Sequence, residues 1–151
     1  MQARQTEPGP VVLPPALLVV AAALVDGAGR VLMQQRPAKR EHGGLWEFPG
    51  GKLEPGEGPA GALVRELREE LAIDVVPEAC VPLGFAANEG GKGARAVVLL
   101  LYGCRTWQGE PVSQEGAQIA WCAPDALGTL AMPPLDIPLA RLVASFLAAP
   151  E

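Results

Sequence analysis

The chain has 151 residues, of which 49% are hydrophobic and 19% are charged, and its formal net charge is −5. This composition excludes intrinsic disorder and predicts a single globular domain with one substantial core. An acidic chain also argues against binding a nucleic-acid polymer through a broad basic surface, although it is compatible with a small anionic ligand brought in with a metal ion. The three cysteines form no CxxC pair and there is a single histidine, so we expect neither a zinc cage nor a disulfide framework. Free thiols suit a reducing cytoplasm.

The N-terminal part divides into a tail and two strands. Residues 1–15 are expected to form a flexible tail, and residues 16–151 a single folded domain. The apolar run 16–25 is too short to span a bilayer, and no strongly basic leader precedes it, so we interpret it as a buried strand of a cytoplasmic protein without membrane contact. A second strand is predicted at 30–36, joined to the first by a hairpin turn at 26–29. The near-continuous aliphatic residues of the first strand predict helices on both faces of the sheet.

A basic stretch surrounds the second strand. Between Arg30 and Lys52 there are five lysine or arginine residues and two acidic residues, a local balance of +3. These side chains either form a wall that contacts phosphate groups or belong to an ordinary solvated loop, and the residues alone leave both alternatives open. Arg36 is the stronger candidate for phosphate contact, because it stands at the end of a strand.

Residues 60–72 predict an amphipathic helix that begins just after Pro59, a residue suited to the first helical position. At about 100° per residue, apolar side chains fall on one side and Glu66, Glu69 and Glu70 on another. Carboxylates at this spacing repel one another by about a few tenths of a kcal/mol per pair. Either a hard divalent cation, Mg²⁺ or Mn²⁺, relieves the repulsion, or the face is solvated and balanced by the two arginines of the same helix.

The loop before this helix favours the metal alternative. Gly50 and Gly51 let the backbone turn sharply and can leave a carbonyl facing the acidic helix as a further oxygen ligand. A Pro-Gly turn then places Glu57 near the start of the helix, within reach of Arg65.

The spacing of these residues resembles the Nudix box, which reads Gly, five residues, Glu, seven residues, Arg-Glu, an aliphatic, one residue, Glu-Glu, one residue, Gly and an aliphatic. The pattern is met at Gly51, Glu57, Arg65, Glu66, Leu67, Glu69, Glu70 and Ile73. One position departs, because Ala72 stands where the family has its final glycine. Glycine readily takes a left-handed helix cap, whereas alanine is less stable there by roughly 1 kcal/mol or the helix ends another way.

Downstream of the box, the sequence predicts the rest of the sheet and its second helical layer. Strands are expected at 73–86, 94–104 and 118–123, and the middle one is almost purely aliphatic and hence central. A glycine-rich loop at 88–93 is expected to be flexible and could lie over a ligand. A short helix or turn at 124–130 precedes an apolar helix at 139–149 that can cover one face of the sheet.

The resemblance covers most of the chain and implies the Nudix fold, an α/β (α+β) architecture in which a mixed β-sheet is sandwiched between α-helices. It implies a hydrolase that uses Mg²⁺, with Mn²⁺ as the alternative ion, on a nucleoside diphosphate linked to another group. A salt bridge between Glu57 and Arg65 would fix the loop to the helix, and Glu66 is the favoured general base with Glu115 as its competitor. The implied metal ligands are Glu66, Glu69, Glu70, Glu115 and the Gly50 carbonyl. The implied substrate-binding residues are Arg36, Phe48, Gly50, Gly51, Lys52 and Asp136.

The base preference depends on Asp136. In MutT-type relatives, which convert a nucleoside triphosphate to the monophosphate and pyrophosphate, a Pro-Pro-x-Asn segment contacts 8-oxoguanine, and this chain has Pro-Pro-Leu-Asp at 133–136. Asp136 either caps the next helix or reads a base. An ionised carboxylate only accepts hydrogen bonds, which suits the N7–H of 8-oxoguanine and equally the exocyclic amine of cytosine.

Three functions follow in order of preference. The first is an 8-oxo-dGTP diphosphatase that sanitises the nucleotide pool, and the second a pyrophosphohydrolase of CTP, dCTP or 5-substituted pyrimidine nucleotides. A distant third is a Nudix module that binds nucleotide without cleaving it. The expected partner is a small nucleotide, and the protein is expected to be a monomer or a homodimer.

Overall fold

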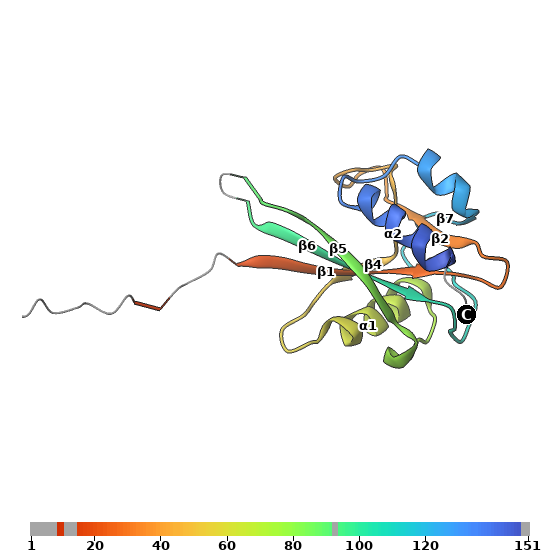
Figure 1. Cartoon of the computed structure of the whole chain (residues 1–151), viewed down its shortest axis with the longest axis horizontal. Coiled ribbons are helices and arrows are strands. Elements are labelled where there is room, and N and C mark those ends of the chain that lie inside the picture. The colour runs from red at the N-terminus through yellow and green to blue at the C-terminus, as the bar shows by residue number, and fades with distance from the viewer. Residues whose placement is uncertain (1–8, 11–14, 92–93, 149–151) are drawn as a thin grey trace, which may run out of the picture.

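The computed structural model describes residues 9–10, 15–91 and 94–148. A four-stranded mixed sheet in the order β4-β1-β6-β5 lies beside a three-stranded sheet in the order β3-β2-β7 (Figure 1). The first sheet contains β1 (Ala16–Leu24), β4 (Gly50–Lys52), β5 (Val81–Asn88) and β6 (Ala96–Cys104), and the second β2 (Val31–Gln35), β3 (Trp46–Glu47) and β7 (Ile119–Cys122). The predicted tail at 1–15 falls outside the described residues, apart from 9–10 and 15, and so does the end of the predicted 88–93 loop.

Two helices cover opposite faces of the mixed sheet (Figure 1). On one face α1 (Pro59–Leu71) buries its apolar stripe against Val20 and Ala22, and on the other α2 (Asp136–Ala148) packs with Ala21 and Leu101. Successive residues of β1 therefore point to different helices, as expected for a strand whose side chains alternate between faces. The predicted sandwich of a mixed sheet between helices is confirmed, with 3₁₀ turns at Pro77–Ala79 and Pro124–Thr129 completing the fold.

The sheet is mixed because β1 and β6 run parallel, in register from Ala16 opposite Ala96 to Leu24 opposite Cys104. The neighbouring pairs, β1 with β4 and β5 with β6, are antiparallel. β6 lies between β1 and β5, so the prediction that this aliphatic strand is central is correct.

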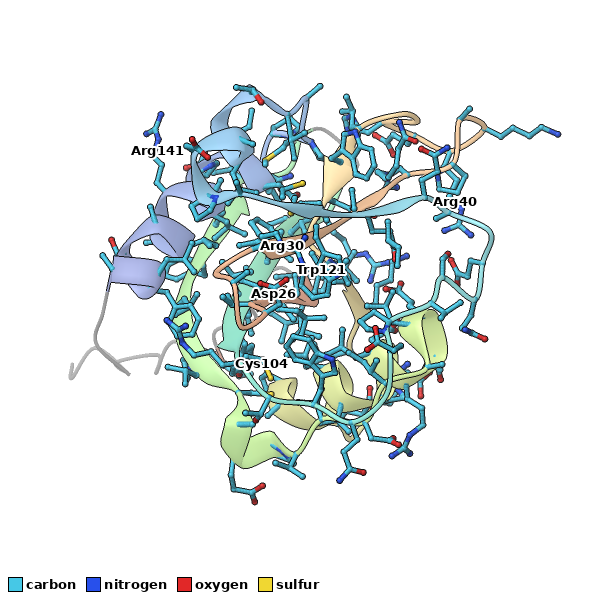
Figure 2. The ribbon with its side chains drawn as sticks, turned by 90° about the vertical axis from the view of Figure 1, so that its right-hand side faces the viewer. Asp26, Arg30, Arg40, Cys104, Trp121 and Arg141 are labelled. Atoms are coloured by element: carbon cyan, nitrogen blue, oxygen red, sulfur yellow. The ribbon has the colours of Figure 1, made fainter. Side chains whose placement is uncertain are left out.

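The turn at 26–29 forms as predicted, but the strands that it joins do not continue as a paired hairpin. The Asp26 Oδ1 atom accepts the backbone N–H groups of Ala28 and Arg30 at 3.0 and 2.8 Å, and the Arg30 guanidinium pairs with the same carboxylate at 2.8 Å (Figure 2). After a single bridge between Val25 and Val31, the two strands separate into different sheets. β6 pairs with β1 along its whole length, and β4 pairs with Val19–Ala21 at the other edge.

The strand expected at 73–86 begins only at Val81. Ile73 and Val75 are buried in the same cluster as the apolar stripe of α1, and Asp74 makes an isolated bridge to Gln108. Pro77 then starts a 3₁₀ turn, because proline has no N–H group to give to a sheet.

The second helix begins earlier than expected, at Asp136 instead of residue 139. Pro138 falls in its first turn, where a missing N–H group breaks no helical hydrogen bond. Within the described part of the chain, neither helix has the length and apolarity needed to cross a membrane.

Candidate functional site

The acidic helix forms as the sequence predicts. Pro59 occupies its first turn, and Leu63, Leu67 and Leu71 are fully buried. Ala72 ends the helix in the left-handed conformation (φ 56°), and its N–H donates to the Arg68 carbonyl at 3.1 Å. The helix therefore ends as it would with the family's glycine, so the glutamates keep their positions relative to the turn that follows.

Arg65 is the centre of an ion-pair network that ties the loop to the helix. Its Nε and Nη2 atoms donate to the two carboxylate oxygens of Glu57, both at 2.8 Å, and Nη2 also donates to the Lys52 carbonyl at 3.0 Å. Its Nη1 atom donates to Glu66 at 3.0 Å and to Glu69 at 3.1 Å. The Arg65–Glu57 pair has two parallel hydrogen bonds, the geometry in which arginine binds carboxylates most strongly. The expected salt bridge between loop and helix is present.

The glycine turn lies directly against two of the glutamates. The Gly50 N–H donates to Glu70 Oε2 at 3.2 Å, and a β-carbon at Gly51 would collide with the Glu66 carboxyl group. A β-carbon at Gly50 would meet the Val20 carbonyl instead. Only glycines allow the backbone to approach both the helix and β1 this closely. At Gly50 the atom that contacts the helix is the N–H, and the metal role of its carbonyl stays a prediction.

Glu115 is brought to the cluster by the loop that precedes β7. The N–H groups of Val112 and Gln114 donate to the carbonyls of Leu71 and Glu70, at 3.0 and 2.8 Å. These carbonyls belong to the last turn of α1, which has no helical partner for them. The loop is thereby fixed along the helix end, and the Glu115 charge acts on both Glu66 and Glu70.

The clustered carboxylates raise one another's proton affinity. Burial, followed by the charges of Glu66 and Glu115, raises the pKa of Glu70 to about 8. Burial also raises the pKa of Glu66, against the lowering effect of Arg65. Glu57 is the opposite case, because its hydrogen bonds from Arg65 lower its pKa to about 2. The negative charge concentrated at Glu66 and Glu70 is therefore not fully compensated by the protein itself.

A hard divalent cation fits this cluster chemically. All the donors are oxygen atoms, and a cation would remove the repulsion that raises the pKa of Glu66 and Glu70. Among the described residues, no three acidic, histidine or cysteine side chains are already arranged around an ion position. Glu69 is one reason for the absence of a preformed ion position, because its side chain is 59% exposed and is directed to Arg65. It would have to exchange that partner to become a ligand.

The predicted base-reading residue lies at a second position, next to the same glycine loop. Asp136 is 5% exposed, and its Oδ2 atom accepts the Phe48 N–H at 3.1 Å. Burial raises the pKa of Asp136 to about 7, with Glu47 raising it further and Arg36 lowering it. Asp136 is the first residue of α2. Its position is therefore compatible with both expected roles, capping the helix and reading a base.

The remaining predicted substrate residues make different contacts. Arg36 pairs with Glu47 at 2.9 Å and borders a cavity of about 180 Å³ that residues 116–118 also line. The Phe48 side chain is buried in the core, so its N–H is the group that faces the site. The Lys52 side chain is exposed, and its carbonyl is the atom that Arg65 contacts.

Glu47 is a site residue that sequence reasoning missed. It lies in β3 opposite Gln34, pairs with Arg36, and raises the pKa of both Glu70 and Asp136. It is therefore the group that connects the carboxylate cluster to the base-reading position. Its place two residues before Pro49, on the segment that leads to the glycine turn, was the available signal.

Comparison with known families and proteins shows what this chain is similar to. The NUDIX domain family matches residues 15–146. The CTP pyrophosphohydrolase of Escherichia coli (strain K12) is 38% identical over 123 residues, which are 82% of this chain and 88% of the relative. The 8-oxo-dGTP diphosphatase of Proteus vulgaris is 39% identical over 101 residues, which are 67% of this chain and 87% of the relative.

The fold is shared with solved structures. The solution structure of the E. coli ORF135 protein is 34% identical with a TM-score of 0.79, covering 93% of this chain and 96% of the other. A structure from a study of MutT from Aliivibrio salmonicida and Vibrio cholerae has a TM-score of 0.70 at 27% identity, over 87% of this chain and 99% of the other. The chain belongs to the Nudix hydrolase family. Within that family it is a pyrophosphohydrolase of the MutT type.

Proposed function

We propose that the protein is a Mg²⁺-dependent nucleoside triphosphate pyrophosphohydrolase whose preferred substrate is 8-oxo-dGTP, which it converts with water to the monophosphate and pyrophosphate. The observation that supports this most is the pair of half-buried carboxylates, Glu66 and Glu70, held against the glycine turn with Glu115 beside them. Substrate phosphates and these carboxylates repel each other unless they share a cation. Mn²⁺ has the same preference for oxygen ligands and is the second candidate ion.

The site residues divide into those that would hold the metal ion and those that take part in the proton transfer. Glu66, Glu69, Glu70, Glu115 and the Gly50 carbonyl are the oxygen donors that would hold the ion. Once bound, the ion would stabilise the negative charge that develops on the leaving pyrophosphate. Glu66 takes the proton of the attacking water, because its carboxylate is fixed between Gly51 and Arg65 and burial raises its pKa above the ordinary value. Glu115 is the competing base, since it faces the same cluster from a different element.

Base selection is assigned to Asp136. Its carboxyl group is buried beside the Phe48 backbone, on the loop that continues into the glycine turn. An accepting oxygen there would pair with the N7–H of 8-oxoguanine and would repel the bare N7 of ordinary guanine. A polar group that is left unpaired in a buried site costs about 1 to 3 kcal/mol, which corresponds to discrimination of about 5- to 150-fold.

A second substrate class is favoured by one comparison. The E. coli relative of 38% identity is named a CTP pyrophosphohydrolase, and the exocyclic amine of cytosine also donates a hydrogen bond to an accepting oxygen. CTP, dCTP and their 5-substituted forms are therefore the alternative substrates for the same carboxylate.

One experiment separates the two candidates. With Mg²⁺ present, kcat/KM is measured for 8-oxo-dGTP, dGTP, dCTP and 5-methyl-dCTP. The proposal predicts the highest value for 8-oxo-dGTP, and a preference for dCTP over 8-oxo-dGTP would reverse the order of the two candidates. Binding of these nucleotides without any turnover would instead support a non-catalytic module. Asp136→Asn should change the ratios between bases, and unchanged ratios would leave Asp136 with a structural role only.

A further inference from the structure

Two of the three cysteines face each other across neighbouring strands. Cys104 is the last residue of β6, and Cys80 immediately precedes β5. Because Val81 is paired with Gly103, Cys80 and Cys104 are the next facing positions of the antiparallel pair. Both are buried, at 8% and 0% exposed, on the face that α1 covers, and Figure 2 places Cys104 there.

The backbone pairing at this position suits a covalent link. The Cys80 N–H donates to the Pro77 carbonyl, and the Cys104 carbonyl accepts from the Val25 N–H, so neither of these groups joins the two cysteines. Facing residues that exchange no backbone hydrogen bonds have Cα atoms about 4.5 Å apart. Disulfides span Cα separations of about 4.4 to 6.8 Å. The strand register thus places the two residues at a separation that a disulfide can bridge.

The two thiols are free and already interact. The interaction between the two thiols lowers the pKa of Cys104 to about 7 and raises that of Cys80. A thiolate is the reactive form of cysteine, so Cys104 is the more nucleophilic of the two. Cys122, in β7 of the other sheet, is half-buried and donates to the Ala120 carbonyl.

A cavity lies close to the two cysteines. This cavity has a volume of about 360 Å³, and none of the clustered carboxylates lines it. Val76 and Thr106 do line it, and their carbonyls lie 3.7 Å from the Cys80 sulfur and 3.1 Å from the Cys104 sulfur. The sulfurs therefore lie directly behind the cavity wall.

We propose that Cys80 and Cys104 are an oxidisable dithiol that a peroxide converts to a disulfide within the folded protein. The Cys104 thiolate attacks one peroxide oxygen, the O–O bond breaks, and the leaving hydroxide takes a proton to become water. The Cys80 sulfur then attacks the Cys104 sulfenic acid, the S–O bond breaks, and a second water leaves. Two thiols lose two electrons and two protons, and one peroxide is reduced to two waters. This reaction is independent of the proposed hydrolase activity.

Mass spectrometry of the full-length protein tests the proposal directly. The protein is treated with hydrogen peroxide, alkylated without reduction, and digested with trypsin. The three cysteines fall on different tryptic peptides, at 69–92, 96–105 and 106–141. We expect free thiols to fall from three to one, with the first two peptides linked and the third alkylated. Three alkylated cysteines, or a link that includes Cys122, would overturn the proposal.

Two variants and a stability measurement complete the test. Cys122→Ser should form the link as the unchanged protein does, whereas Cys104→Ser should leave Cys80 unlinked. If Cys104→Ser does not fold, the peptide map of the unchanged protein still decides. A disulfide restricts the unfolded chain, so the oxidised protein should melt at a higher temperature than the reduced one, and a thiol reductant should reverse the difference. An oxidised form that melts no higher contradicts a bond that the native register accommodates.

Discussion

Arg65 holds Glu57 through two parallel hydrogen bonds of 2.8 Å, and the same guanidinium reaches Glu66. The loop and the acidic helix are thus joined through one side chain, which is 22% exposed. A flat, five-donor group is needed to contact Glu57, Glu66 and a backbone carbonyl at once. The position of the glycine turn relative to the carboxylates therefore depends on arginine specifically.

Replacing Arg65 with lysine should lower kcat/KM for the preferred nucleotide by roughly 10- to 100-fold, because a single ammonium group cannot make two parallel hydrogen bonds to the Glu57 carboxylate. Arg68→Lys is the matched control, since Arg68 pairs with Asp74 on the exposed side of the same helix. An exposed pair of this kind contributes about 0 to 1 kcal/mol, so this control should keep its activity. Equal activities of the two variants would show that the Arg65 network does not position the site.

Gly51 should not tolerate a side chain. A methyl group there would collide with the Glu66 carboxyl, so Gly51→Ala should displace Glu66 and reduce kcat by about 100-fold. Gly58→Ala is the control, because a β-carbon at Gly58 meets nothing within 4 Å. Steady-state kinetics with circular dichroism would separate a displaced carboxylate from a lost fold. Wild-type turnover in Gly51→Ala would refute the close approach.

Asp136 should make the protein less stable as the pH rises. Its pKa is about 7 in the folded protein against an ordinary 3.8, so between these values the folded state binds the extra proton. This contribution to stability is complete below about pH 4 and is lost as the pH passes 7. Asp136→Asn keeps an oxygen for the Phe48 N–H without a charge, and should raise Tm at pH 8 by about 3 to 8 °C.

The same variant should have little advantage near pH 4, where Asp136 is neutral in the folded protein. Differential scanning calorimetry at the two pH values measures the contrast. Asp125→Asn, at an exposed position in the 3₁₀ turn, should follow the wild-type profile. A pH-independent difference between Asp136→Asn and wild type would mean that burial does not disfavour the Asp136 charge.

Ala72→Gly should stabilise the protein. Ala72 has φ 56°, a conformation that is less favourable for alanine than for glycine. After the greater flexibility of glycine in the unfolded chain is deducted, we expect a gain of about 0.5 to 1 kcal/mol in the free energy of unfolding. Ala60→Gly, inside the same helix, should lose about 1 kcal/mol. Urea denaturation measures both, and a loss in Ala72→Gly would contradict the cap geometry.

The parts of the fold that were predicted correctly depend on local signals. Pro59 and the 3.6-residue spacing of leucines define α1, and Asp26 with its glycines defines the first turn. No local sequence signal predicts the sheet partner of β1, because that partner is β6, which begins far along the chain at Ala96. A good hairpin turn therefore suggested a hairpin, but β1 pairs with β6 and β4.

The candidate site likewise has parts that local sequence signals predict and parts that they do not. The Glu57–Arg65 pair and the Glu66 and Glu70 positions come from one continuous segment, so the sequence spacing was sufficient to predict their neighbourhood. Glu115 reaches the cluster through backbone bonds to the end of α1, which a sequence pattern alone does not encode. Glu47 was missed because its effect on Asp136 requires β3 to lie beside the start of α2.

The most direct test of the account is the turnover of Glu66→Gln with Mg²⁺ and the preferred triphosphate. Glutamine has nearly the same shape, so the fold and its melting temperature should be retained while the charge and the base are lost. We predict that kcat falls by about three orders of magnitude or more, since one general base alone contributes about 10² to 10⁴. Turnover near the wild-type rate in a folded Glu66→Gln protein would contradict the assignment of the carboxylate cluster as the active site.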